Sequence, residues 1–224
     1  MKYPWIFFDA DETLFHFDAF KGLQLMFLGY GVTFTRNDYQ QYQSVNLPLW
    51  VQYQDGQIDA ETLKHKRFEN WAEKLQVTTQ DLNSQFLRAM AEICTLLPGA
   101  AELLAILSGK ATLGIITNGF TDLQHVRLQK MGLDETFSVI IISEEVGVAK
   151  PHIDIFNQAF KAINHPPKDH ILMVGDNLFS DITGGINAGI HTCWLNRNDE
   201  ACPDHIQPHY QVNSLSELSA ILTA

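Results

Sequence analysis

The sequence has few cysteines, little positive charge and no long apolar run. Three cysteines, Cys94, Cys193 and Cys202, occur among 224 residues without C-x-x-C spacing, so we expect free thiols. The sequence has 15 Lys and Arg residues and 26 Asp and Glu residues, which gives a net charge of −11. This negative charge argues against binding to nucleic acid polymers. No stretch approaches the roughly 20 apolar residues of a membrane span, and Asp9 and Asp11 interrupt the N-terminal apolar run before a signal peptide could form. We therefore expect a cytoplasmic globular protein that does not contact membranes.

Strand and helix patterns alternate from residue 98 to the C-terminus. Short apolar runs predict strands at 111–117, 139–143, 171–175 and 190–195. Between and after them, helical patterns occupy 100–107, 122–131, 153–163, 179–188 and 215–222. This alternation predicts an α/β fold with a doubly wound parallel sheet, which binds ligands at the carboxyl ends of its strands. The apolar run at 5–8 is expected to add a further strand to the same sheet.

Residues 15–97 have a different character, because their pattern is typical of helices and they hold 13 of the 24 aromatic residues. Helix-start signals at Thr35, Asp59 and Thr78 predict a small bundle of about four helices, with a break or kink at Pro48. The bundle is therefore expected to be an insertion into a core formed by residues 1–14 and 98–224.

Asp9 and Asp11 directly follow the buried strand predicted at residues 5–8. Carboxylates at that position are costly, because they lose hydration and repel each other. Chains place acids there for chemistry or for metal binding. The alternative is that one of the two aspartates caps a following helix.

Two more polar sequences follow predicted strands. Thr117-Asn118-Gly119 comes after the strand at 111–117, where a hydroxyl and exposed backbone amides suit a bound phosphate. A plain Asn-Gly turn is the alternative. Lys150 precedes Pro151, which we expect in the first turn of the next helix; a lone lysine there could equally be a solvated surface charge.

A third polar sequence follows the strand at 171–175. Asp176 lies at the strand end, and Asp181 follows about one helical turn later, so that both can face one point. Capping of the next helix by Asp176 is the alternative. The three sequences fall at successive strand ends, where a site is expected.

The order DxDxT, TNG, KP and GDxxxxD closely resembles the four motifs of the haloacid dehalogenase superfamily, and the insertion lies where that family carries its type-one cap. The resemblance extends over the whole chain. The stretches FFDADETLF, SEEVGVAKP and GGINAG are most similar to its pyrimidine 5′-nucleotidase subgroup, which dephosphorylates deoxyuridine, thymidine and uridine monophosphates. Glu12 departs from the superfamily pattern, in which a small residue follows the second aspartate, and matches the subgroup.

Charge arithmetic predicts a divalent cation. Four negative charges meet at one point, those of Asp9, Asp11, Asp176 and Asp181. Lys150 supplies one positive charge, and a phosphate monoester adds further negative charge that repels the carboxylates. An all-oxygen site beside a phosphate suits Mg²⁺, with Mn²⁺ or another divalent ion as a substitute. The resemblance implies ligation by the Asp9 and Asp176 side chains and the Asp11 backbone carbonyl, with Asp181 orienting metal-bound water or Lys150.

The resemblance also implies the roles in catalysis. Asp9 attacks phosphorus to form an aspartyl-phosphate, and Asp11 protonates the leaving oxygen and then deprotonates the hydrolytic water. Thr117, the Asn118 backbone and Lys150 hold the phosphoryl oxygens. The substrate is then a small phosphomonoester, a nucleoside monophosphate by resemblance, and the protein is expected to be a monomer or a weak homo-oligomer.

Other activities of this fold remain alternatives. Dehalogenation of 2-haloacids needs no proton donor at Asp11, and phosphonate cleavage needs a lysine in the cap, where Lys64 and Lys66 are predicted to face solvent. Hydrolysis or mutase chemistry of sugar phosphates and a non-catalytic binding role stay open as well. Within the cap, Phe17, Phe20 and Trp50 are the aromatic residues expected to line the cleft, since they flank the first motif or Pro48.

Overall fold

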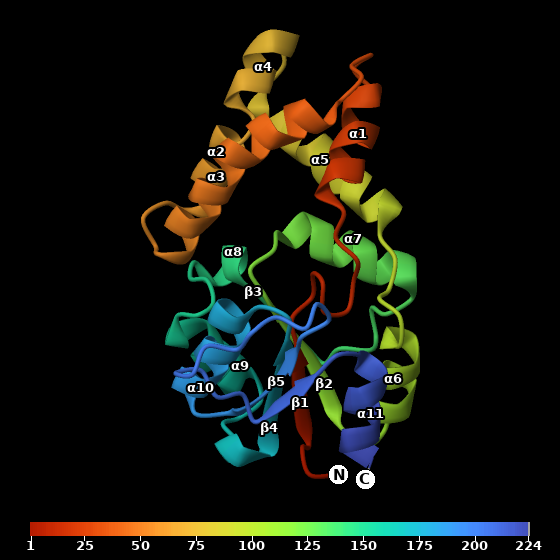
Figure 1. Ribbon diagram of the computed structural model, residues 1–224, viewed down its shortest axis with the longest axis vertical. Helices are drawn as coiled ribbons and strands as arrows, with labels where there is room; N and C mark the ends of the chain where they lie inside the picture. Colours follow the sequence, from red (N-terminus) through yellow and green to blue (C-terminus); the bar gives the residue numbers. More distant parts are fainter. Residues whose placement is uncertain (224) are drawn as a thin grey trace.

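The computed structural model describes residues 1–223, and its centre is one six-stranded parallel sheet (Figure 1). The strands are β1 (Trp5–Phe8), β2 (Thr112–Thr117), β3 (Val139–Ile142), β4 (Ile171–Gly175), β5 (His191–Leu195) and β6 (Tyr210–Val212). They lie in the order β3-β2-β1-β4-β5-β6, and every neighbouring pair is parallel. The predicted α/β class with a doubly wound sheet is confirmed.

Strand β1 lies between β2 and β4 and is buried on both faces. Phe8 pairs with Ile115 on one side and with Val174 on the other. Successive side chains of a strand point to opposite faces, so Phe7 and Phe8 contribute to different hydrophobic clusters. This central position explains why the first strand is almost entirely apolar.

Helices cover both faces of the sheet. One cluster joins Ile6 and Phe8 to α6 (Ala100–Leu107) and α11 (Leu215–Thr223), and the other joins Phe7 to α9 (Ile153–Ala162) and α10 (Gly184–Ala188). Helix α7 (Thr121–Met131) lies between the sheet and the inserted helices (Figure 1). Short turns of helix are found at α8 (Ser143–Val146), η1 (Lys168–His170) and η2 (Leu178–Thr183). No helix within residues 1–223 is long and apolar enough to cross a membrane.

The insertion folds as five helices above the carboxyl edge of the sheet (Figure 1). They are α1 (Ala19–Leu28), α2 (Arg36–Gln54), α3 (Ala60–Lys66), α4 (Glu69–Leu75) and α5 (Thr79–Ile93). The predicted caps are present: the side chains of Thr35, Asp59 and Thr78 each accept a backbone N–H bond from the third residue on. These helices share a hydrophobic cluster, which Phe120, Leu123 and Ala149 of the core also join. We therefore propose that residues 15–97 form a cap domain on the core of residues 1–14 and 98–224.

Two short segments join the insertion to the core and run side by side. The N–H of His16 donates to Thr95 O at 2.9 Å, and the N–H of Leu97 donates to Leu14 O at 2.9 Å. Near this junction, Leu123 of α7 packs into the cluster of the insertion, whereas Leu128 packs into the core. Helix α7 is therefore shared by the two parts.

Several local predictions were wrong. Of the break or kink predicted at Pro48, the break does not occur and the kink stays a prediction. Pro48 lies inside the 19-residue helix α2, where the burial of Tyr42, Leu49 and Tyr53 on one face offsets the single hydrogen bond that proline removes. The bundle has five helices where about four were predicted, and the helical residues between the caps at Asp59 and Thr78 are divided at Arg67 and Phe68.

The core differs from the prediction at three places. Pro151 is not in the first turn of α9, because the side chain of His152 caps the helix and helical residues begin at Ile153. The helix predicted at 179–188 is a wide π-type turn followed by α10. The three-residue edge strand β6 was not predicted, since so short a run carries no periodicity.

Candidate active site

Three neighbouring strands end at one point on the carboxyl edge of the sheet. Asp9 follows β1, Thr117 ends β2, and Asp176 follows β4. Because β2, β1 and β4 are adjacent and parallel, the three side chains meet there. They line a pocket of about 250 Å³. Asp11, Asn118, Lys150 and the predicted cleft residue Trp50 line the same pocket, so seven of the predicted site residues are brought together.

Lys150 is buried at the bottom of this pocket, where its side chain is 1 % exposed. Its ammonium group lies 2.6 Å from Asp9 Oδ1, 2.7 Å from Asp181 Oδ1 and 2.6 Å from the carbonyl of Ile116. The alternative of a solvated surface lysine is therefore wrong. All three acceptors are oxygens, so the charge of Lys150 is fully compensated within the protein.

The side chain of Asn118 holds the backbone of Lys150 in place. Its Oδ1 accepts the Lys150 N–H at 2.7 Å, and its Nδ2 donates to the Lys150 carbonyl at 2.9 Å. The side chain of Asn118 is thus used for structure, and its backbone amide is the group left to face a phosphate. In the same loop, Thr117 Oγ1 accepts the N–H of Gly119 at 3.1 Å and is the hydroxyl nearest the strand end.

The carboxylates around Lys150 carry more charge than it neutralises. Burial, reinforced by Asp181 and Asp176, raises the pKa of Asp9 to about 8, even though Lys150 opposes the shift. Burial and Asp181 raise the pKa of Asp176 to about 7. Burial lowers the pKa of Lys150, but Asp181 and Asp9 outweigh it and hold that pKa above the ordinary value.

The donor set fits a hard divalent cation. Carboxylate oxygens of Asp9, Asp176 and Asp181 lie within 4.8 Å of one another. Asp181 already uses both oxygens, because Oδ1 contacts Lys150 and Ser180 and Oδ2 accepts the N–H of Asn177 at 3.0 Å. Asp9 and Asp176 therefore have the freer oxygens, which agrees with a supporting role for Asp181.

Asn177 and Arg127 are site residues that sequence reasoning missed. Asn177 caps η2 by accepting the N–H groups of Phe179 and Ser180 at 3.0 and 2.9 Å, so Asp176 does not cap the helix. An asparagine before a helical pattern is a recognisable N-cap signal. Arg127, from α7, donates through Nη1 to Asp11 Oδ1; a single arginine on a helix carries no comparable signal.

Glu12 has a left-handed backbone with φ 57°. That conformation favours glycine, which is the physical reason for a small residue at this place in the family pattern. The Glu12 carboxylate accepts the N–H of Phe17, lies 3.1 Å from His16 Nδ1 and pairs with Arg197. These contacts tie the turn after the first motif to the loop that follows β5.

Of the three predicted cleft aromatics, the structure brings one to the pocket. Trp50 lines it from α2, and its ring lies 5.4 Å from that of Phe120, which directly follows the loop of Thr117, Asn118 and Gly119. Phe20 instead packs inside the insertion against Tyr39, 5.3 Å between ring centroids, with the Arg36 guanidinium 3.8 Å from its ring. Phe17 contributes its backbone N–H to Glu12 and does not line the pocket.

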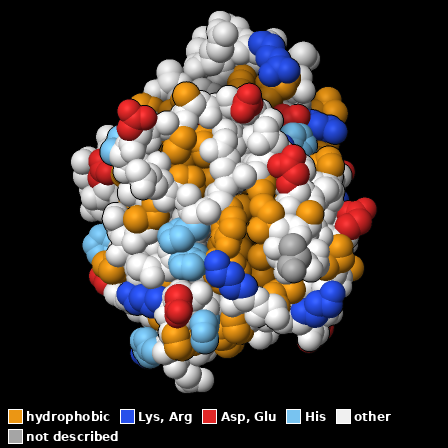
Figure 2. Space-filling model, turned by 60° about the horizontal axis from the view of Figure 1, so that its bottom comes forward, with side chains coloured by type: hydrophobic (Ala, Val, Ile, Leu, Met, Phe, Trp, Pro, Cys, Tyr) orange, Lys and Arg blue, Asp and Glu red, His pale blue; other side chains and the backbone are white. Residues whose placement is uncertain are grey.

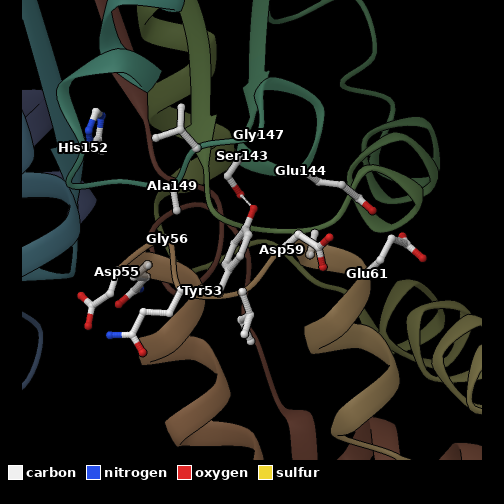
Figure 3. Close-up of a pocket in the computed structure, with 15 residues that line it drawn as sticks. Tyr53, Asp55, Gly56, Asp59, Glu61, Ser143, Glu144, Gly147, Ala149 and His152 are labelled. Atoms are coloured by element: carbon white, nitrogen blue, oxygen red, sulfur yellow. Dashed lines mark hydrogen bonds between the residues drawn. The ribbon is translucent and has the colours of Figure 1, made fainter.

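A larger cleft of about 650 Å³ opens beside the pocket, between the end of α2 and α8 (Figure 3). The hydroxyl of Tyr53 donates to Ser143 Oγ at 2.8 Å across this cleft. Lys64 pairs with Glu144, and its side chain is 14 % exposed, so the expectation that Lys64 faces solvent is wrong. Both contacts connect the insertion to the core beside the pocket.

Comparison with known proteins identifies the family. The model of the haloacid dehalogenase-like hydrolases matches residues 3–189. The chain is 57% identical to pyrimidine 5′-nucleotidase YjjG of Escherichia coli over 99% of both chains, and 32% identical to pyrimidine 5′-nucleotidase PynA of Streptococcus pneumoniae over 97% of this chain and 94% of that one.

A solved structure agrees with this assignment. The crystal structure of Bacillus subtilis YfnB bound to magnesium superposes with a TM-score of 0.86 at 31% identity, with all of both chains covered. A 2-haloacid dehalogenase of Pseudomonas syringae, at 22% identity and a TM-score of 0.75, shares the fold. Since the family model covers far more than half of the sequence and the relatives align along its length, the chain belongs to the haloacid dehalogenase-like hydrolases.

Proposed function

We propose that the protein is a Mg²⁺-dependent phosphatase of nucleoside monophosphates, with pyrimidine 5′-nucleotides as its preferred substrates. The observation that carries the reaction type is the pair Asp9 and Lys150 at the bottom of a pocket that also holds Asp11, Thr117 and Asp176. The 57% identity to a pyrimidine 5′-nucleotidase over the whole chain supports the substrate class.

Asp9 is the nucleophile in this proposal. Lys150 occupies its Oδ1, and its Oδ2 accepts no hydrogen bond within residues 1–223. One carboxylate oxygen is therefore oriented by Lys150 while the other is available to attack phosphorus and form an aspartyl-phosphate. Thr117 and the Asn118 backbone hold the phosphoryl oxygens, beside the ammonium group of Lys150.

Asp11 lines the same pocket two residues further along the chain. As the bond from phosphorus to the leaving oxygen breaks, Asp11 donates its proton to that oxygen and the nucleoside departs. The resulting carboxylate then takes a proton from the water that attacks the aspartyl-phosphate, which regenerates Asp9 and releases inorganic phosphate. A dehalogenase needs no such proton donor, so Asp11 favours the phosphatase.

Mg²⁺ would be held by the side chains of Asp9 and Asp176 and by the backbone carbonyl of Asp11, with Asp181 supporting them. When bound, it supplies positive charge that offsets both the clustered carboxylates and the phosphate. The magnesium-bound structure of YfnB supports this choice of metal. The free thiols of Cys94, Cys193 and Cys202 suit the cytoplasmic location that we propose.

Steady-state kinetics on a panel of phosphomonoesters test the proposal. With Mg²⁺ present, we expect kcat/KM for deoxyuridine, thymidine and uridine monophosphates to exceed that for purine nucleotides and sugar phosphates by about tenfold or more, the effect of roughly 1.4 kcal/mol of selective binding. A flat profile would contradict the nucleotide assignment, and the absence of hydrolysis for every ester would contradict the phosphatase.

A further inference from the structure

A buried polar chain on α7 ends at the carboxylate of Asp11. Gln124 and Arg127 lie one helical turn apart and are 0% and 1% exposed. Gln124 Oε1 accepts a hydrogen bond from Arg127 Nη2, and Arg127 Nη1 donates to Asp11 Oδ1. The side chain of Asp11 is 29% exposed and lines the catalytic pocket. A fully buried guanidinium thus supports a partly exposed carboxylate.

This arrangement is expensive as a purely structural contact. Arg127 Nε and Gln124 Nε2 are both buried and find no hydrogen-bond partner within residues 1–223. Each unsatisfied group costs about 1–3 kcal/mol. The ring of Phe15, 4.4 Å from the guanidinium, offsets part of this cost through a cation–π contact. An apolar residue in place of the arginine would avoid the cost, so stability alone does not account for it.

The hydrogen-bonded pair Gln124 and Arg127 also contacts the loop of residues 117–119. A Cβ atom on Gly119 would lie 2.3 Å from Gln124 Nε2 and 3.3 Å from Thr117 Oγ1, so the glycine leaves the space that Gln124 occupies. Helix α7 begins at Thr121, directly after that loop. The same few residues therefore connect the phosphate-binding end of β2 with the turn that carries Asp11.

We propose that Arg127, itself braced by Gln124, is a positioning residue that holds Asp11 for proton transfer to the leaving oxygen. Asp11 Oδ1 is fixed by the guanidinium, and Oδ2 accepts no hydrogen bond from the described residues, which leaves it for the substrate. This inference rests on the proposed phosphatase function and deepens it. A displaced acid loses its contribution to the rate, which is about 10²- to 10⁴-fold for general acid–base catalysis.

Leaving-group dependence separates positioning of an acid from general structural support. Replacing Arg127 by Met keeps the volume and removes the donors. We expect Arg127→Met to lower kcat/KM by about 100-fold or more for a nucleoside monophosphate, whose alkoxide leaves only with a proton. For 4-nitrophenyl phosphate, whose leaving group needs no proton, the loss should stay below about tenfold. Arg127→Lys, which keeps the charge but not the fork, should recover part of the loss.

Two comparisons make the result decisive. Arg88→Met removes an exposed arginine from α5 and should leave kcat/KM for both esters unchanged. In an Asp11→Asn background, Arg127→Met should add no further selective loss, because the acid it positions is already absent. Equal losses for the two esters, or a selective loss that persists in that background, would overturn the inference.

Folding is checked by circular dichroism. If Arg127→Met fails to fold, Gln124→Leu replaces it as the test variant, with the same selective loss of kcat/KM expected for the nucleoside monophosphate. A loss of kcat/KM of similar size for both esters would again overturn the inference. Wild-type protein that hydrolyses neither ester would instead refute the proposed function, so the two failures are distinguishable.

Discussion

The ammonium group of Lys150 lies 2.6 Å from Oδ1 of Asp9, although 141 positions separate the two residues in the sequence. Both side chains are buried, and the same ammonium group contacts Asp181 at 2.7 Å. One cation thus holds two acids that would otherwise repel each other.

Asp9→Asn should remove activity without unfolding the protein. The amide cannot form an acyl phosphate, whereas Lys150 keeps Asp181 and the Ile116 carbonyl as partners. We expect kcat to fall by about 10³-fold or more, as for other lost nucleophiles. The measurement is hydrolysis of a nucleoside monophosphate with circular dichroism as the folding check, and Asp204→Asn, in an exposed loop, is the control. Normal turnover in Asp9→Asn would sink the nucleophile assignment.

Lys150→Met should destabilise the fold as well as inactivate it. Without the ammonium group, the carboxylates of Asp9 and Asp181 are buried with no cation, and breaking such a pair costs about 3–5 kcal/mol. Urea unfolding measures the loss. Lys161→Met, which removes an exposed lysine of α9, should leave the unfolding midpoint nearly unchanged. An unaltered midpoint for Lys150→Met would contradict the compensation argument.

Chelation of divalent ions should abolish hydrolysis, and added Mg²⁺ should restore it. Mg²⁺ should also raise the melting temperature, because a ligand at 100 times its Kd stabilises the folded state by about 2.7 kcal/mol. Asp176→Asn removes one carboxylate of the cluster and should abolish the thermal shift. Full turnover in EDTA, or an unchanged shift in Asp176→Asn, would show that the carboxylates do not form the metal site.

Trp50→Ala should weaken nucleotide binding. Stacking of a base on an aromatic ring is worth about 1–3 kcal/mol, so kcat/KM for a nucleoside monophosphate should fall about 5- to 150-fold. Phe20→Leu is the matched variant, because Phe20 lies in the same bundle but packs against Phe34 and Tyr39. Hydrolysis of a small alkyl phosphate without a base should change little. An equal loss for both esters would exclude stacking by Trp50.

A pair of stacked histidines makes stability depend on pH. The rings of His191 and His209 lie 4.2 Å apart at the end of the sheet opposite the pocket, where histidine and basic side chains gather (Figure 2). Burial lowers the pKa of both below 6.5; Lys2 adds to the shift of His191, and His191 adds to that of His209. Well above pH 6.5 both histidines are neutral in the folded and the unfolded state, so they do not lower the free energy of unfolding. As the pH falls below 6.5, the unfolded chain binds protons first, so stability is lost.

Urea unfolding at pH 7.5 and pH 5.5 measures this effect. The wild-type midpoint should fall on acidification, and His209→Gln should reduce the fall because the stacked pair is gone. His205→Gln, a change at an exposed histidine, should behave like the wild type. An identical fall in His209→Gln and the wild type would assign the pH dependence to other groups.

Local patterns were enough to predict most elements and which strand ends form the candidate pocket. Strand β4 and helix α6 begin and end where the sequence predicted, because apolar runs and helix-start signals act over a few residues. Because parallel strands end at one edge of a sheet, the sequence also predicted that Asp9, Thr117 and Asp176 lie close together. The break considered at Pro48 does not occur, because packing of a whole helix face outweighs one lost hydrogen bond.

Only tertiary packing decided which polar groups meet. The structure buries Arg127 and Gln124 on one face of α7, but nothing in the local pattern predicts that Arg127 contacts Asp11, 116 positions away. Likewise, the hydrogen bonds between the Asn118 side chain and the Lys150 backbone join segments distant in sequence. The packing of Phe20 against Tyr39, away from the pocket, also depends on tertiary structure. The carboxylate pair Asp9 and Asp11 was evident from the chain, because a charged end to an apolar strand is a local contrast. The cations that hold the pair come from other elements, since hydrogen-bond partners are chosen by distance in space.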